Sequence, residues 1–218
     1  MRIVELQIDS PDTAEQRDFY HGAFGFPVVD RTRDKLVLRA GSTQLAFAHT
    51  QRPMAGVYHL AFNIPENRFD EAVRWLRERV QLISDDTGAD TFHSDEWNAD
   101  MVYFLDPAGN IVELIARHTL PSTSEHRFTG ESVLCVSEIG IAAKDVVAET
   151  KSIAERAQAP IYSGADSDTF TAIGNEHGLF VVVKRGRIWF PNSGKAAEPV
   201  PINVVTKSAA GVIRWQFA

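Results

Sequence analysis

Three short segments of the chain share one pattern of polar and apolar positions. They span residues 4–8, 58–62 and 137–141, and in each a polar residue stands near the start of an otherwise apolar strand-like run. Each segment is followed by an amphipathic helical pattern and then by further short strands. Repetition of this order indicates one small βαβββ module that is used three times. The sequence therefore predicts an α+β fold built from repeated βαβββ modules.

Turn residues and changes of composition divide the chain into these modules. The first module covers residues 1–53, the second 57–120, and residues 130–218 hold a degenerate third module with a C-terminal tail. Helices are predicted after the cap Ser10-Pro11-Asp12 and over residues 68–80 and 146–157; strands are predicted in the tail over 202–205 and 212–215. Residues 85–100 are acidic and without clear periodicity, so we expect a long loop there.

Polar side chains at repeated strand positions are candidates for chemistry. Because side chains alternate between the two faces of a strand, Glu5 and Gln7 share one face, and His59 occupies the place equivalent to Glu5 in the second module. Glu113 follows the turn 106–110 and interrupts an apolar strand. A buried carboxylate is costly unless a cation or hydrogen-bond donors compensate it. A divalent metal is the simplest compensation, so Glu5, His59 and Glu113 are candidate metal ligands.

Composition narrows the class of protein. The chain has 218 residues, of which 44% are hydrophobic and 23% charged, and its net charge of −7 provides no basic face for nucleic acid. It contains no apolar run long enough to cross a bilayer and its start lacks the apolar core of a signal peptide, so we expect a cytoplasmic protein without a membrane partner. Cys135 is the single cysteine, so any metal site must use nitrogen and oxygen ligands.

These motifs resemble those of the vicinal oxygen chelate superfamily, which includes glyoxalase I, fosfomycin and bleomycin resistance proteins, and extradiol dioxygenases. The features that carry the resemblance, in chain order, are Glu5, Phe19-Tyr20 with Phe24-Gly25-Phe26, His59, and Asp106-Pro107-Ala108-Gly109-Asn110 leading to Glu113. The last motif is the most specific of them. The resemblance is strong over residues 1–120 and faint over 133–184.

The resemblance implies both an architecture and a metal site. In the superfamily two paired modules form a cup-shaped mixed sheet, and residues from the first and last strands of each module bind a divalent metal. We therefore expect modules 1–53 and 57–120 to pair into one domain of residues 1–120. By position, Glu5, His59 and Glu113 would bind a zinc, nickel, manganese or iron ion.

The fourth ligand position of the resemblance is not filled by a metal-binding residue. Leu45 stands where the first module would place a counterpart of Glu113, so the site has at most three protein ligands and keeps open positions for water or substrate. In the third module Glu138 keeps the first position, but Val182 occupies the last. We interpret this module as structural or as a dimerisation element.

Four further residues are candidates for substrate binding, one on the face of Glu5 and three in the acidic stretch, where they could form a lid. They are Gln7, His93, Trp97 and Asn98. By contrast, we interpret Trp189 and Phe190 as anchors of the C-terminal tail.

Three functions are consistent with these features. The first is a divalent-metal-dependent lyase or isomerase that acts on a small substrate chelating through vicinal oxygens, with Glu5 or Glu113 moving a proton. The second is an Fe(II) extradiol dioxygenase, although such sites prefer two histidines and one carboxylate. The third is a non-catalytic drug-binding protein that retains the cup. A homodimer is also expected, because an unpaired third module would have an exposed sheet face.

Overall fold

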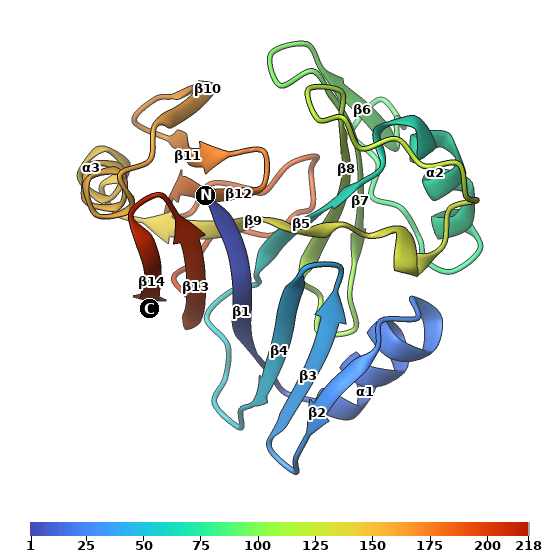
Figure 1. The fold of residues 1–218 in the computed structure, drawn as a ribbon. Helices are drawn as coiled ribbons and strands as arrows, with labels where there is room; N and C mark the ends of the chain where they lie inside the picture. The colour runs from blue at the N-terminus through green and yellow to red at the C-terminus, as the bar shows by residue number, and fades with distance from the viewer. Residues whose placement is uncertain (218) are drawn as a thin grey trace.

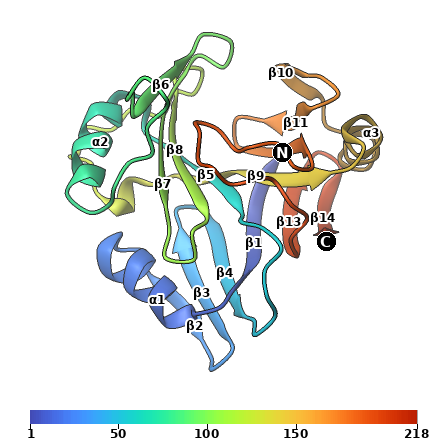
Figure 2. The ribbon, with the colours of Figure 1, turned by 180° about the vertical axis from the view of Figure 1, so that it is seen from behind.

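Two β-sheets and their flanking helices make up the computed structural model, which describes residues 1–217 (Figures 1 and 2). The six-stranded sheet has the order β14-β13-β1-β4-β3-β2, and the eight-stranded sheet has the order β10-β11-β12-β9-β5-β8-β7-β6. The predicted α+β fold of repeated βαβββ modules is confirmed. Within residues 1–217 no helix combines the length and the apolar character that crossing a membrane requires.

The first module follows the predicted order of elements. They are β1 (Arg2–Ser10), α1 (Thr13–Arg17), the π-helical turn η1 (Asp18–Ala23), β2 (Val28–Arg31), β3 (Lys35–Ala40) and β4 (Thr43–His49). The helix begins at the predicted cap, where the Asp12 carboxylate accepts hydrogen bonds from the backbone N–H groups of Ala14 and Glu15 at 2.7 and 3.0 Å.

The second module contains one more strand than the sequence predicted. Its elements are β5 (His59–Ile64), η2 (Glu66–Arg68), α2 (Phe69–Arg77), β6 (Thr91–Ser94), β7 (Ala99–Leu105) and β8 (Ile111–Arg117). Residues 85–100 were expected to form a loop, but they include β6, which pairs with β7 in an antiparallel hairpin. β6 is only four residues long, which is too short for strand alternation to stand out in the sequence.

The third module is complete, and the tail adds a hairpin to the other sheet. A short turn η3 (Gly130–Ser132) precedes β9 (Cys135–Ala143), α3 (Val146–Ala157), β10 (Ile161–Asp166), β11 (Phe170–Asn175) and β12 (Gly178–Lys184); the tail forms β13 (Ile202–Ser208) and β14 (Gly211–Phe217). The predicted helix over 146–157 and both predicted tail strands are confirmed.

The modules pair differently from the expectation. Strand β5 of the second module pairs with β9 of the third, while β1 of the first module pairs with β13 of the tail hairpin. The expected pairing of modules 1–53 and 57–120 is therefore wrong, and the third module is half of the cup. The physical reason is burial on both faces: every residue of β5, and all but one of β9, is buried, whereas one face of β1 carries exposed or half-buried polar residues.

One apolar core lies between the two sheets. Leu6 and Phe47 of the six-stranded sheet and Phe62 and Ile139 of the eight-stranded sheet are all fully buried in it. The opposite face of the eight-stranded sheet forms a second, smaller cluster that includes Met101, Tyr103 and Trp189. This second face is the concave side on which the candidate site lies.

Candidate metal centre

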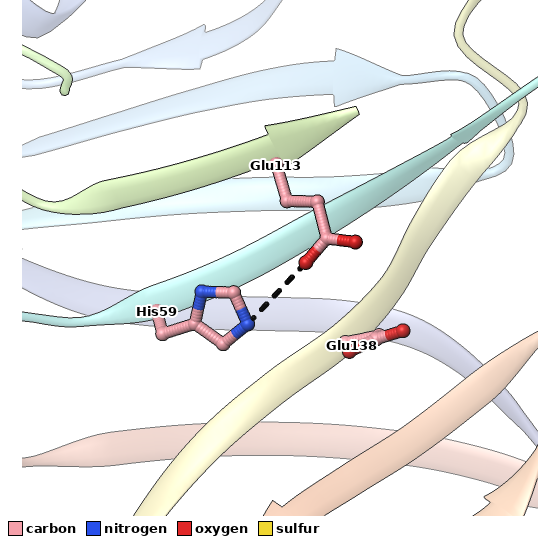
Figure 3. Close-up of side chains that lie close together, drawn as sticks. All are labelled: His59, Glu113 and Glu138. Carbon is pink, nitrogen blue, oxygen red and sulfur yellow. Dashed lines mark ion pairs between the residues drawn. The ribbon is translucent and has the colours of Figure 1, made fainter. Parts of the chain in front are cut away.

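Three polar residues meet on the concave face because of the register of three adjacent strands. Ala61 of β5 pairs with Glu113 of β8 on one side and with Glu138 of β9 on the other. His59 lies two residues before Ala61 and so shares its face. The small side chain of Ala61 leaves the space between the two carboxylates open. Figure 3 shows His59, Glu113 and Glu138 converging from these three strands.

The turn before β8 fixes this register. Buried Asp106 accepts hydrogen bonds from the backbone N–H and the side-chain amide of Asn110, both at 2.9 Å, and from Gln16 and Tyr20 of the first module. The Asn110 side-chain oxygen in turn accepts the backbone N–H of Tyr58 at 3.1 Å. The turn thereby ties the start of β8 to the start of β5, which places Glu113 beside Ala61.

The three side chains form a group whose ligand atoms all lie within 4.8 Å of one another. The exposed fractions of His59, Glu113 and Glu138 are 7%, 2% and 2%. His59 Nε2 lies 3.6 Å from Glu113 Oε2. His59 Nδ1 and Glu113 Oε1 are buried and have no hydrogen-bond partner among the described residues. Buried polar atoms are rarely left unpartnered, and a cation held between His59 Nε2 and the carboxylates would give Glu113 Oε1 the partner that it lacks.

Burial also sets the protonation of the group. It lowers the pKa of His59 to about 4, so that the imidazole is neutral near physiological pH and keeps a lone pair. Burial, followed by repulsion from Glu138, raises the pKa of Glu113 well above its ordinary value. Burial raises the pKa of Glu138 as well, while Arg117 opposes that rise. A neutral imidazole and two carboxylates in a dry site fit a divalent cation, which would stabilise both carboxylates in their ionised form.

A cavity of about 560 Å³ opens above these three residues. Six aromatic side chains are among its lining residues, namely Phe92, Trp97, Tyr103, Phe170, Trp189 and Phe190, and Glu96 and Arg187 also line it. The segment between β12 and β13 supplies Trp189, whose indole packs on the His59 ring with centroids 5.0 Å apart. Gly140 of β9 makes room for this indole, because a Cβ there would lie 2.4 Å from Trp189 Cη2.

The structure separates Glu5 and Gln7 from this site. Both lie on β1 in the other sheet, where they line a distinct cavity of about 760 Å³ with Gln44 and Arg214. Glu5 is exposed on that face. Glu5 therefore does not join His59 and Glu113, because the first module pairs with the tail hairpin and not with the second module.

The three predicted lid residues have different positions. His93 of β6 and Trp97 line the aromatic cavity. The Trp97 indole N–H donates to the Ser163 carbonyl oxygen at 3.0 Å. Asn98 lies in the turn between β6 and β7 with a φ of 44°, which is the left-handed conformation, and is not among the lining residues of the cavity.

Glu138 is the site residue that sequence reasoning set aside. The structure also places Val181, not Val182, at the position equivalent to Glu113, because Val181 pairs with Gly140 as Glu113 pairs with Ala61. By the same register Ala46, not Leu45, is the counterpart in the first module; Leu45 and Val182 face the shared core. The available signal was the polar Glu138 within β9, a strand that is otherwise small or apolar on both faces.

Trp189 and Phe190 also differ from the expectation, since both line the cavity while they anchor the segment. Trp189 is 7% exposed and its indole nitrogen has no hydrogen-bond partner within the described residues. Nothing in the local sequence of the tail distinguishes an anchor from a cavity wall.

One solved structure agrees with this architecture, and two others are similar to about half of the chain. The crystal structure of a provisionally named dioxygenase from Bacillus subtilis is similar with a TM-score of 0.60 at 14% identity; the match covers 84% of this chain and 63% of that one, and it supports the fold alone. A lactoylglutathione lyase from Agrobacterium tumefaciens has a TM-score of 0.44 at 19% identity, over 52% of this chain and 91% of that one. A glyoxalase family protein from Enterococcus faecalis has a TM-score of 0.43 at 25% identity, over 52% and 96%.

The match to a family is the finding that assigns the chain. No curated protein matches the sequence. The sequence model of the Glyoxalase/Bleomycin resistance protein/Dioxygenase superfamily matches residues 2–114, which is more than half of the chain. The chain therefore belongs to the Glyoxalase/Bleomycin resistance protein/Dioxygenase superfamily.

Proposed function

We propose that this protein is a divalent-metal-dependent lyase or isomerase whose small substrate chelates the metal through two neighbouring oxygens. The observation that carries the proposal is the convergence of His59, Glu113 and Glu138 at the floor of the cavity, where the buried Oε1 of Glu113 has no hydrogen-bond partner among the described residues. A divalent cation held by these residues would act as a Lewis acid toward a substrate oxygen.

The residues of the chain would bind and orient the substrate and transfer a proton to or from it. Glu113, when released from the cation, would exchange a proton with a substrate bound above it. The aromatic side chains of the cavity would favour a substrate with an apolar, ring-bearing body next to its two oxygens. Tyr103, which pairs with Glu113 across β7 and β8, stays protonated because burial raises its pKa well above its ordinary value.

Elemental analysis of protein purified without chelators or an affinity tag tests this proposal. The wild type should contain near-stoichiometric zinc, nickel or manganese, and His59→Ala, Glu113→Ala and Glu138→Gln should lose it. Glu5→Gln is the matched control, because Glu5 has the equivalent module position but lies in the other sheet, and this variant should retain the metal. Wild-type protein that is metal-free and cannot be reconstituted would refute the proposal.

The same elemental analysis distinguishes two alternative functions. Stoichiometric iron would favour an extradiol-type dioxygenase, although the group has one histidine and two carboxylates where such sites prefer the reverse. Metal-free protein that binds aromatic compounds would favour a drug-binding protein, which the aromatic cavity also suits. The homodimer and the cytoplasmic location stay predictions.

A further inference from the structure

Arg117 lies beside the candidate metal centre, and the proposed function does not use it. It ends β8, four residues after Glu113 and on the same face of the strand. Its side chain is completely buried, and its Nη2 donates to Oε1 of Glu138. Arg117 is thus the charged partner of a candidate metal ligand.

The guanidinium group of Arg117 is held from several sides. Its Nε donates to the side-chain oxygen of Asn63 at 3.2 Å, and its Nη1 lies 3.5 Å from the Tyr162 hydroxyl oxygen. Asn63 is fixed in turn, because its amide nitrogen donates to the Glu176 carbonyl oxygen at 2.7 Å.

Aromatic rings complete the enclosure of the guanidinium. Its central carbon lies 5.3 Å from the ring centroid of Trp97 and 5.6 Å from that of Tyr162. A planar group fixed at its edge by hydrogen bonds and covered by two rings cannot follow a moving carboxylate without breaking several contacts. Glu138 is therefore attached to a rigid donor.

We propose that Arg117 is a positioning residue that holds one oxygen of Glu138, so that only the other is available to a divalent cation. This inference rests on the proposed function, in which Glu138 is a metal ligand. Two consequences follow. The positive charge of Arg117 weakens cation binding, and a carboxylate that binds through one oxygen leaves one more coordination position for the substrate.

Titration of metal-free protein with Mn²⁺ tests this role, with calorimetry for affinity and water-proton relaxation for the number of water molecules on the bound ion. In Arg117→Met the affinity should rise about tenfold or more, because a nearby positive charge is removed. The bound ion should also lose about one water molecule, because the released Glu138 can bind through both oxygens. If Arg117 only stabilised the fold, Arg117→Met would instead bind Mn²⁺ more weakly and the hydration of the bound ion would be unchanged.

Arg156→Met is the matched control, because Arg156 also covers an indole, at 4.3 Å from the Trp215 centroid, but Trp215 belongs to β14 of the other sheet. It should leave Mn²⁺ binding unchanged. If Arg117→Met does not fold, Arg117→Lys keeps the charge and loses the planar fork; its affinity should rise about threefold, with the same loss of water.

The outcomes separate the two proposals. A wild-type protein that binds no divalent cation would refute the proposed function. Wild-type binding with unchanged or weakened affinity in the folded Arg117 variant would overturn the positioning role alone.

Discussion

Replacement of Gly140 by alanine should push the Trp189 indole away from His59. Gly140 lies on the concave face of β9, two residues after Glu138. A Cβ at this position would lie 2.4 Å from Cη2 and 3.0 Å from Cζ2 of Trp189, and 3.2 Å from the Cβ of His59. Non-bonded carbon atoms pack at about 3.5–4.0 Å, so the indole must move by about 1 Å or more.

The free energy of unfolding should fall by about 2–3 kcal/mol in Gly140→Ala. Overpacking of a well-packed core costs about 1–3 kcal/mol. The displaced indole would also lose its contact with His59, where the ring centroids are 5.0 Å apart, and such aromatic contacts contribute about 0.5–1.5 kcal/mol. Since the same movement uncovers the His59 ring, affinity for a divalent cation should fall as well.

Urea unfolding, monitored by far-UV circular dichroism, measures this loss of stability. The same substitution in a variant that lacks the Trp189 indole identifies its cause. In a Trp189→Leu background the cost of Gly140→Ala should fall below about 1 kcal/mol, because the two closest clashing atoms are gone and only the 3.2 Å contact with the Cβ of His59 remains. Gly22→Ala is the control, since a Cβ there would meet nothing within 4 Å, and it should change stability little. An equal cost of Gly140→Ala in both backgrounds would refute the steric explanation.

Three further predictions concern ionisable groups in metal-free protein. Because the pKa of His59 is about 4 when folded and 6.5 when unfolded, the unfolding free energy should fall by about 3 kcal/mol as pH drops from 6.5 through 4, and His59→Gln should lack this component in urea titrations. Glu113→Gln should raise the free energy of unfolding, and the gain should grow as pH rises through the raised pKa of Glu113, because the folded wild type must then bury a charge. Urea midpoints of wild type and variant that converge at high pH would contradict this. Asp106→Ala should cost about 3 kcal/mol or more by calorimetry, because donors of Asn110 and Tyr20 lose their acceptor, and Asp106→Asn should cost less.

Local sequence determined most elements of the modules, with β6 as an exception. The cap at Asp12, the helix over 146–157 and the turn at 106–110 depend on residues close together in the chain, and the structure has all three. Strand alternation also placed His59 on the face of Ala61 and Glu113 on the face of Ile111, and the pairing of β5 with β8 joins these two faces. These features depend on backbone geometry and nearby hydrogen bonds, which a short stretch of sequence specifies.

Tertiary structure decided which modules share a sheet. The first strands of all three modules carry a polar residue at the same position, so the repeat alone does not distinguish Glu5 from Glu138 as the partner of His59. The distinction depends on the register between β5 and β9, whose residues are far apart in the sequence. The faces of β5 and β9 that line the cup carry small residues such as Ala61 and Gly140, which suit burial. The corresponding face of β1 is polar instead.

The cavity walls and the charged partner of Glu138 were likewise beyond local sequence. Trp189 reaches His59 only because the segment after β12 crosses the concave face, and Arg117 reaches Glu138 only because β8, β5 and β9 lie side by side. Sequence by itself determined the modules and two of the three candidate ligands, since these follow from local periodicity and turn chemistry. The third ligand, its arginine and the aromatic cover were decided by long-range strand pairing, because burial on both faces, and not any local pattern, selects the strands that become neighbours.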